Sequence, residues 1–175
     1  MSRSGFVSDN GPGRLFALVG LPHAGKSTFA NRWVREASTD PAGTWRPRVV
    51  LAGDDFRLAL HGQEYVAQAE HFVFSTLDVA AAALLLRGFD VLIDETSTSK
   101  PTLMRYLRLD PKVELIFVRT PTLECKRRAT ANGKAFLHRV IDRLEPRLRD
   151  LEANWPQLRA ELLSQVEHLV PLCRG

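Results

Sequence analysis

Residues 20–27 of this chain are Gly20-Leu21-Pro22-His23-Ala24-Gly25-Lys26-Ser27. They have the spacing G-x-x-x-x-G-K-S, in which the two glycines let backbone N–H groups turn inward around a β-phosphate. In this arrangement Lys26 reaches the β- and γ-phosphate oxygens, and the Ser27 hydroxyl ligates Mg²⁺. The apolar run 15–19 precedes the loop and a helical pattern follows it. We therefore predict a nucleotide site; the alternative is a glycine-rich turn that binds nothing.

The helix that begins near Gly25 directs its positive end toward the same anion. We expect ATP to contact most residues of the loop and the first residue after it: Gly20, Pro22, His23, Ala24, Gly25, Lys26, Ser27 and Thr28. His23 occupies a variable position that faces outward, so we expect it to contact adenine or solvent rather than to act in catalysis.

Length and composition favour one domain. The chain has 175 residues, 45% of them apolar, which is sufficient for a single buried core. Residues 1–13 lack an apolar centre, so we expect a disordered tail and no signal peptide, followed by one domain over 14–175. Cys125 and Cys173 lie far apart and outside any metal-binding spacing, which favours reduced thiols and a cytoplasmic protein. The most apolar run, 79–86, is too short to span a bilayer, so we expect no membrane association.

The chain is modestly basic, with a net charge of +4 and a sequence pI near 9.4. The excess of arginine and lysine lies between Lys100 and Arg149. A basic surface can follow a polyanion such as nucleic acid, or it can form a lid that neutralises ATP phosphates. Both interpretations remain open at this point.

Hydrophobic patterns alternate between strands and helices along the chain. Strands are expected at 15–19, 48–52, 89–93 and 113–118, and helices at 26–37, 64–86, 102–107, 123–131 and 137–170, the last with breaks at Pro146 and Pro156. Strands separated by helices pair in parallel through right-handed crossovers. The predicted fold is a three-layer α/β fold of the P-loop type, with a central, mostly parallel sheet. A small helical lid is expected at about 124–139 and C-terminal helices at about 140–170.

Polar side chains follow each predicted strand, where a parallel sheet binds its ligand. The second strand leads into Asp54-Asp55-Phe56-Arg57, the third into Asp94-Glu95-Thr96, and the fourth into Arg119-Thr120. These groups converge on the phosphate loop and suit phosphoryl transfer, which needs a hydroxyl nucleophile, a base or orienting group, Mg²⁺ and cations.

Each of these side chains has a candidate role. Asp54 is the candidate base that accepts the acceptor proton, and Arg57 would hold the acceptor or the acceptor's own phosphate. Alternatively, Asp54 or Asp55 serves only as a helix N-cap. Asp94 is the candidate second magnesium-directing carboxylate, acting through a water. Glu95 and Thr96 are expected on the acceptor side, and Glu95 also leaves open a water-activating, hydrolytic role.

Together, the loop, the Asp54-Asp55-Phe56-Arg57 element and the strand ending in Asp94-Glu95-Thr96 resemble the small P-loop kinases typified by the polynucleotide 5′-hydroxyl kinases. Related small-molecule and toxin kinases share the pattern, which covers about residues 14–145. The resemblance implies ATP and Mg²⁺ as cofactors, Asp54 as the general base, and Arg57 as the ligand of an acceptor-side phosphate. It also implies a basic lid that clamps ATP phosphates after the fourth strand, where this chain has Cys125-Lys126-Arg127-Arg128.

The chain departs from that pattern at two places. Where a second lid arginine is common, it reads Thr130-Ala131-Asn132-Gly133-Lys134, so Arg127 or Arg128 would serve alone or Lys134 would substitute. An Asn is frequent in the family where this chain has Glu95-Thr96-Ser97. The simplest alternative for the lid cations is a solvated helix face.

Three classes of function fit the sequence. The first is an ATP-dependent kinase for a hydroxyl acceptor, either a polynucleotide 5′-hydroxyl, a hydroxyl on a base or nucleoside, or a small molecule such as a sugar, antibiotic or metabolite. The second is a regulatory NTPase, and the third is a nucleotide-binding module without turnover. Tyr65, Phe72 and Phe74 either stack on a base or pack in the core. The oligomeric state is left open.

Overall fold

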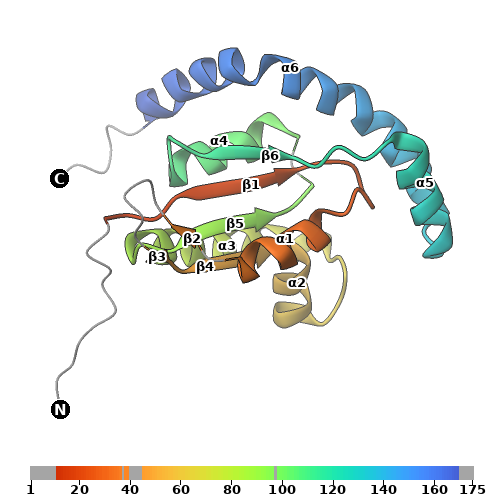
Figure 1. Ribbon diagram of the computed structural model, residues 1–175, viewed down its shortest axis with the longest axis horizontal. Helices are drawn as coiled ribbons and strands as arrows, with labels where there is room; N and C mark the ends of the chain where they lie inside the picture. Colours follow the sequence, from red (N-terminus) through yellow and green to blue (C-terminus); the bar gives the residue numbers. More distant parts are fainter. Residues whose placement is uncertain (1–10, 37, 40–44, 97, 170–175) are drawn as a thin grey trace.

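The computed structural model describes residues 11–36, 38–39, 45–96 and 98–169 (Figure 1). Residues 1–10 of the expected tail, and Cys173, lie outside this part of the chain. In chain order the elements are β1 (Leu15–Val19), α1 (Lys26–Arg35), β2 (Ser38–Thr39), β3 (Trp45–Arg46), β4 (Arg48–Ala52), α2 (Gly53–His61), η1 (Ala67–Ala69), α3 (Glu70–Leu86), β5 (Asp90–Asp94), α4 (Lys100–Leu109), β6 (Glu114–Phe117), α5 (Thr122–Ala131), η2 (Ala135–Leu137) and α6 (His138–Leu169).

The central sheet has the strand order β4-β5-β1-β6, and every pair of neighbours is parallel. The register places Leu15 of β1 beside Val91 of β5 and Val19 beside Phe117 of β6. The short β2 and β3 form a separate antiparallel pair. Because β1 lies between β5 and β6, the loop that follows β1 opens at the centre of the carboxyl edge. This confirms the predicted parallel α/β fold.

The two faces of β1 pack against different helices because successive strand side chains point to opposite faces. Phe16 and Leu18 contact α1, where the Trp33 ring meets the Phe16 ring edge-on at 5.6 Å. Leu15, Ala17 and Val19 belong to the larger core on the opposite face, which α3, α4 and α6 cover. Figure 1 shows α1 on one side of the sheet and the long α6 on the other. These are the three layers that the pattern predicted.

The predicted helix 64–86 was wrong at its start, and α2 was missed. Helix α2 follows β4 directly and ends at Gly62, which adopts a left-handed conformation with φ 70°. Residues 63–66 then turn the chain, so α3 begins only at Glu70. The N-cap of α2 is Ala52, which means that Asp54 and Asp55 lie in the first turn rather than at the cap. The N-cap alternative for these carboxylates is therefore wrong.

Helix α6 is continuous from His138 to Leu169, so the predicted breaks at Pro146 and Pro156 were also wrong. An interior proline costs about 3 kcal/mol because it removes a hydrogen-bond donor and crowds the preceding turn. One face of α6 buries Ile141, Leu151 and Leu162. Each such side chain stabilises the fold by about 1.5–3 kcal/mol, so this packing offsets both prolines.

Helix α3 is unusually apolar. With η1 it forms the segment Ala67–Leu86, which by length and composition alone could cross a bilayer, with a mean hydropathy of 1.5. However, Val73, Leu77, Ala81 and Leu85 recur every four residues and are buried in the core. We conclude that this helix closes one face of the sheet.

Candidate nucleotide and acceptor site

A cavity of about 970 Å³ opens at the carboxyl edge of the sheet. Its walls come from the loop after β1, the ends of β4 and β5, the start of α2, α3, and the segment around α5. The lining includes most of the predicted site: Pro22, His23, Gly25, Lys26, Ser27, Thr28, Asp54, Arg57, Asp94, Glu95, Thr96, Arg128 and Lys134. Phe74 lines it as well, whereas Arg127 does not. The structure thus brings residues from six separate segments into one space.

The loop has the backbone conformation that an anion-binding turn needs. Gly25 has φ 97°, a left-handed conformation in which a side chain would be strained, and His23 has φ 60°. The Lys26 ammonium donates to the backbone carbonyls of Gly20 at 3.2 Å and Leu21 at 3.0 Å. Burial lowers the pKa of Lys26, and the carboxylate of Asp94 partly opposes this effect. A buried ammonium that donates to backbone carbonyls of the loop is well placed to bind a phosphate oxygen.

Ser27 and Asp94 lie side by side at the base of the cavity. The Asp94 carboxylate accepts a hydrogen bond from the Ser27 hydroxyl, and burial raises the pKa of Asp94. Among the described residues, no group of three or more His, Cys, Asp or Glu side chains is arranged to hold a metal ion. A hydroxyl beside one carboxylate nevertheless fits Mg²⁺, because Mg²⁺ keeps several waters and uses substrate phosphates as further ligands.

Asp54 and Arg57 form an ion pair one turn apart on α2, with 2.6 Å between Nη1 and Oδ1. The Asp54 side chain is 88% exposed, so its other oxygen can reach into the cavity. Arg57 is much less accessible, because it also pairs with Glu70 at the start of α3. The structure therefore joins two of the four residues that the sequence assigned to the acceptor side.

Glu95 lies deeper than sequence reasoning placed it. Its side chain is only 9% exposed, and its Oε2 accepts hydrogen bonds from Arg105 at 2.8 Å and from the Tyr106 hydroxyl at 2.9 Å. Arg105 also lies 3.0 Å from Asp78 and covers the Phe74 ring. Thr96, by contrast, is exposed at the cavity rim.

Four residues beneath the acceptor side were missed: Glu70, Asp78, Arg105 and Tyr106. They lie on α3 and α4, which are different helices from the elements that carry Arg57 and Glu95. Glu70 contacts Arg57, Arg105 and Tyr106 contact Glu95, and Asp78 contacts Arg105. The helix predicted over 64–86 placed Glu70 in its second turn, so its position in the first turn of α3 could not be read from the sequence.

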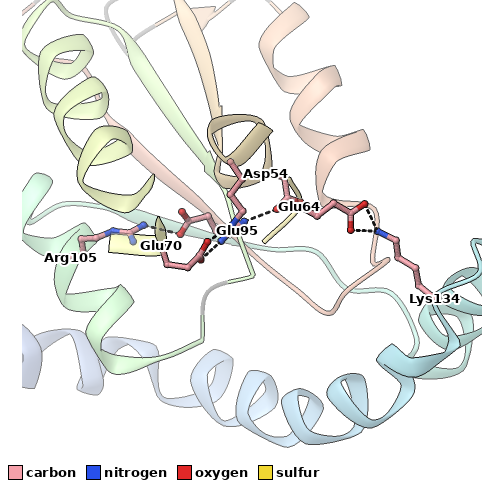
Figure 2. Close-up of polar contacts among 7 residues, drawn as sticks. Asp54, Glu64, Glu70, Glu95, Arg105 and Lys134 are labelled. Carbon is pink, nitrogen blue, oxygen red and sulfur yellow. Dashed lines mark hydrogen bonds and ion pairs between the residues drawn. The ribbon is translucent and has the colours of Figure 1, made fainter. Parts of the chain in front are cut away.

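The lid cations differ in where they point. Arg128 lines the cavity and donates to the backbone carbonyl of His23 at 3.4 Å, next to the phosphate loop. Both arginines pair with Glu124, but Arg127 is 71% exposed and Arg128 is 42% exposed. Lys126 pairs with Asp142 of α6. Lys134, which lines the cavity, contacts Glu64 (Figure 2). The arrangement favours Arg128 over Arg127 as the cation nearest to bound phosphate.

This difference predicts unequal effects of two matched substitutions. We expect Arg128→Ala to lower kcat for ATP turnover by about 100-fold, the typical loss when one preorganised charge contact is removed. Arg127→Ala should leave kcat essentially unchanged, because its side chain points to solvent. Steady-state kinetics on both variants, with circular dichroism to check folding, test this prediction. Equal losses for both variants would contradict it.

The pH dependence of the unfolding free energy tests the environment of Asp78, which pairs with Arg105 next to the site. Burial raises the pKa of Asp78 from its ordinary 3.8 to about 6. Between these two values the folded protein holds a proton that the unfolded chain has released, so this group stabilises the fold as the pH falls. Relative to Asp78→Asn, the wild type should gain about 1 kcal/mol in unfolding free energy between pH 7 and pH 5. Parallel pH profiles from denaturant unfolding would contradict this.

The parallel sheet and the G-x-x-x-x-G-K-S loop at its carboxyl edge define a P-loop fold. Residues 15–151 match the family model AAA_33, an AAA domain. The match covers well over half of the chain, so the protein belongs to this family. No curated protein matches the chain.

Solved structures agree with this assignment. One chain in the structure of the Pnkp1/Rnl/Hen1 complex is 26% identical with a TM-score of 0.57, over 67% of this chain and 39% of that chain. A chain in the structure of the Pnkp1/Rnl/Hen1 RNA repair complex is 22% identical with a TM-score of 0.59, over 79% and 46% respectively. The chain in the crystal structure of APE1195 has 18% sequence identity to this chain and a TM-score of 0.53. The match covers 89% of this chain and 97% of that chain. The second and third structures are less than 25% identical to this chain, so they support the fold alone. This chain spans less than half the length of the two chains from the Pnkp1/Rnl/Hen1 structures.

Proposed function

We propose that this protein is an ATP-dependent kinase that transfers the γ-phosphate to a hydroxyl group. The observation that carries the proposal is the Asp54–Arg57 pair, which shares one cavity with Lys26, Ser27 and Asp94. A nucleotide switch or a binding module has no need of a carboxylate base on the acceptor side. A phosphotransferase needs one in this position.

In the proposed reaction the acceptor oxygen attacks the γ-phosphorus of ATP. The bond between that phosphorus and the β–γ bridging oxygen breaks, ADP leaves with the bridging oxygen, and the hydroxyl proton moves to Asp54. Lys26 and Arg128 stabilise the negative charge that spreads over the phosphoryl oxygens. Ser27 and Asp94 would hold Mg²⁺, which neutralises phosphate charge when bound.

Two classes of acceptor have separate support. A polynucleotide 5′-hydroxyl, or a hydroxyl on a base or nucleoside, is supported by the resemblance noted in the sequence and by similarity to a chain of the Pnkp1/Rnl/Hen1 complex. A small molecule is supported by the ion-paired state of Arg57, the residue that would otherwise bind a phosphate of the acceptor. Either reaction suits a cytoplasmic enzyme, which is our expectation for its location.

The test is transfer of label from γ-labelled ATP to a panel of acceptors. The panel comprises 5′-hydroxyl DNA and RNA, duplex DNA with hydroxymethylated bases, free nucleosides, and aminosugars. We expect label on one class of acceptor and loss of that transfer in Asp54→Asn. Release of inorganic phosphate only, unaffected by Asp54→Asn, would instead indicate a regulatory NTPase.

A further inference from the structure

Arg57 is held by carboxylates at each of its three nitrogens. Its Nε donates to Glu70 at 2.8 Å, Nη2 donates to the other Glu70 oxygen at 2.7 Å, and Nη1 donates to Asp54 at 2.6 Å. The Glu70 contact is therefore bidentate, the strongest geometry for a guanidinium and a carboxylate. The Arg57 and Glu70 side chains are only 16% and 18% exposed. Glu70 thus occupies the Nε–Nη2 edge of Arg57, one of the two edges at which a phosphate could bind in the same bidentate way.

The surroundings add more negative charge. Next to Arg57, the second guanidinium, Arg105, pairs with Asp78 and Glu95 (Figure 2 shows the Glu95 contact). Asp55 also lines this side of the cavity. The acceptor side thus combines five carboxylates (Asp54, Asp55, Glu70, Asp78 and Glu95) with two guanidinium groups, a formal net charge of −3.

From this geometry we infer that Glu70 is a positioning residue that also determines specificity: it holds Arg57 against Asp54, so the site accepts an alcohol that carries no phosphate beside its reacting hydroxyl. The inference rests on the proposed kinase function and narrows its acceptor. Arg57 then orients the Asp54 carboxylate rather than binding the acceptor. A phosphate on the acceptor would meet an already neutralised guanidinium and the surrounding carboxylates, and like charges at close range disfavour binding.

The first test compares two acceptors that differ by a single phosphate: a nucleoside and its 3′-monophosphate, which share the same 5′-hydroxyl. We expect the wild type to use the nucleoside with at least about tenfold higher kcat/KM. Glu70→Gln keeps the shape of the side chain but removes its charge, so the ratio should move at least about tenfold toward the 3′-monophosphate. Preference of the wild type for the 3′-monophosphate overturns the inference.

Glu64→Gln is the matched control. Glu64 is an exposed carboxylate whose ion-pair partner is the cavity-lining Lys134 rather than Arg57. The same substitution there should leave the acceptor ratio at the wild-type value. An equal shift in both variants overturns the role of Glu70, because it would show only a general effect of charge.

The second test needs no turnover and therefore separates this inference from the proposed function. With a non-hydrolysable ATP analogue and Mg²⁺ saturating the nucleotide side, calorimetry measures the binding of inorganic phosphate. We expect at least about tenfold tighter binding to Glu70→Gln than to the wild type, and loss of that gain when Arg57→Ala is added. If the wild type itself binds phosphate in a way that Arg57→Ala abolishes, the inference is wrong even if Glu70→Gln fails to fold. If no acceptor receives label, the kinase proposal is wrong. The calorimetric measurement of phosphate binding would still decide whether Glu70 blocks Arg57.

Discussion

Lys26→Met is expected to reduce kcat for ATP turnover by about 1,000-fold, the upper range for losing one preorganised charge in a site shielded from water. Lys26 is the cation at the centre of the loop, and its ammonium is held by the carbonyls of Gly20 and Leu21 until a phosphate replaces them. Methionine fills similar space without the charge. Steady-state kinetics with γ-labelled ATP measure the effect.

The same variant should not be less stable than the wild type. Burial lowers the pKa of Lys26, which shows that the folded protein disfavours the charged form. Removing the ammonium therefore should leave the thermal midpoint in the absence of nucleotide unchanged or higher. Loss of turnover with an intact midpoint separates catalysis from folding, whereas undiminished turnover would overturn the nucleotide site as a whole.

Asp54→Asn is expected to lower phosphoryl transfer by about 10²–10⁴-fold, the usual contribution of a general base, with ATP affinity unchanged. The amide keeps the size of the side chain and can remain near Arg57, but it cannot accept the acceptor proton. Single-turnover transfer measures the chemical step, and calorimetry with a non-hydrolysable analogue measures nucleotide binding.

Asp55→Asn provides the control for this second substitution. Asp55 lies in the same first turn of α2 and lines the same cavity, but Asp54 is the one that pairs with Arg57. We expect a much smaller loss in Asp55→Asn. If the two variants lose activity equally, or if Asp54→Asn retains full transfer, the assignment of Asp54 as the base is wrong.

The sequence predicted the strands β1 and β4 and the end of α5 well, because short runs of apolar residues and turn residues specify these features. The apolar run Leu15–Val19 is a fully buried strand, and β4 begins and ends where its residues predicted. The break after α5 at Asn132-Gly133 also occurs, with Gly133 in a left-handed conformation at φ 70°. Where long-range packing intervened, the predictions failed: α6 passes through Pro146 and Pro156 because its apolar face is buried along its length.

The candidate site likewise has a part that the sequence predicted and a part that it did not. The glycines, Lys26 and Ser27 of the loop were recognisable because backbone geometry and phosphate chemistry require those residue types at that spacing. The partners of Arg57 and Glu95 were not, because Glu70 and Arg105 reach them from other helices. No local pattern specifies which distant carboxylate will meet a given guanidinium.

The sequence by itself therefore determined the parallel α/β fold, the phosphate loop and the carboxylates at the strand ends, since each depends on a short run of residues and on fixed periodicities. Only the tertiary structure decided that Arg128 rather than Arg127 faces the loop, and that Glu70 neutralises Arg57. Those outcomes depend on how α3 packs on the sheet and on how α5 packs against α6 and the phosphate loop. That packing is set by the burial of apolar faces far from the charged groups it brings together.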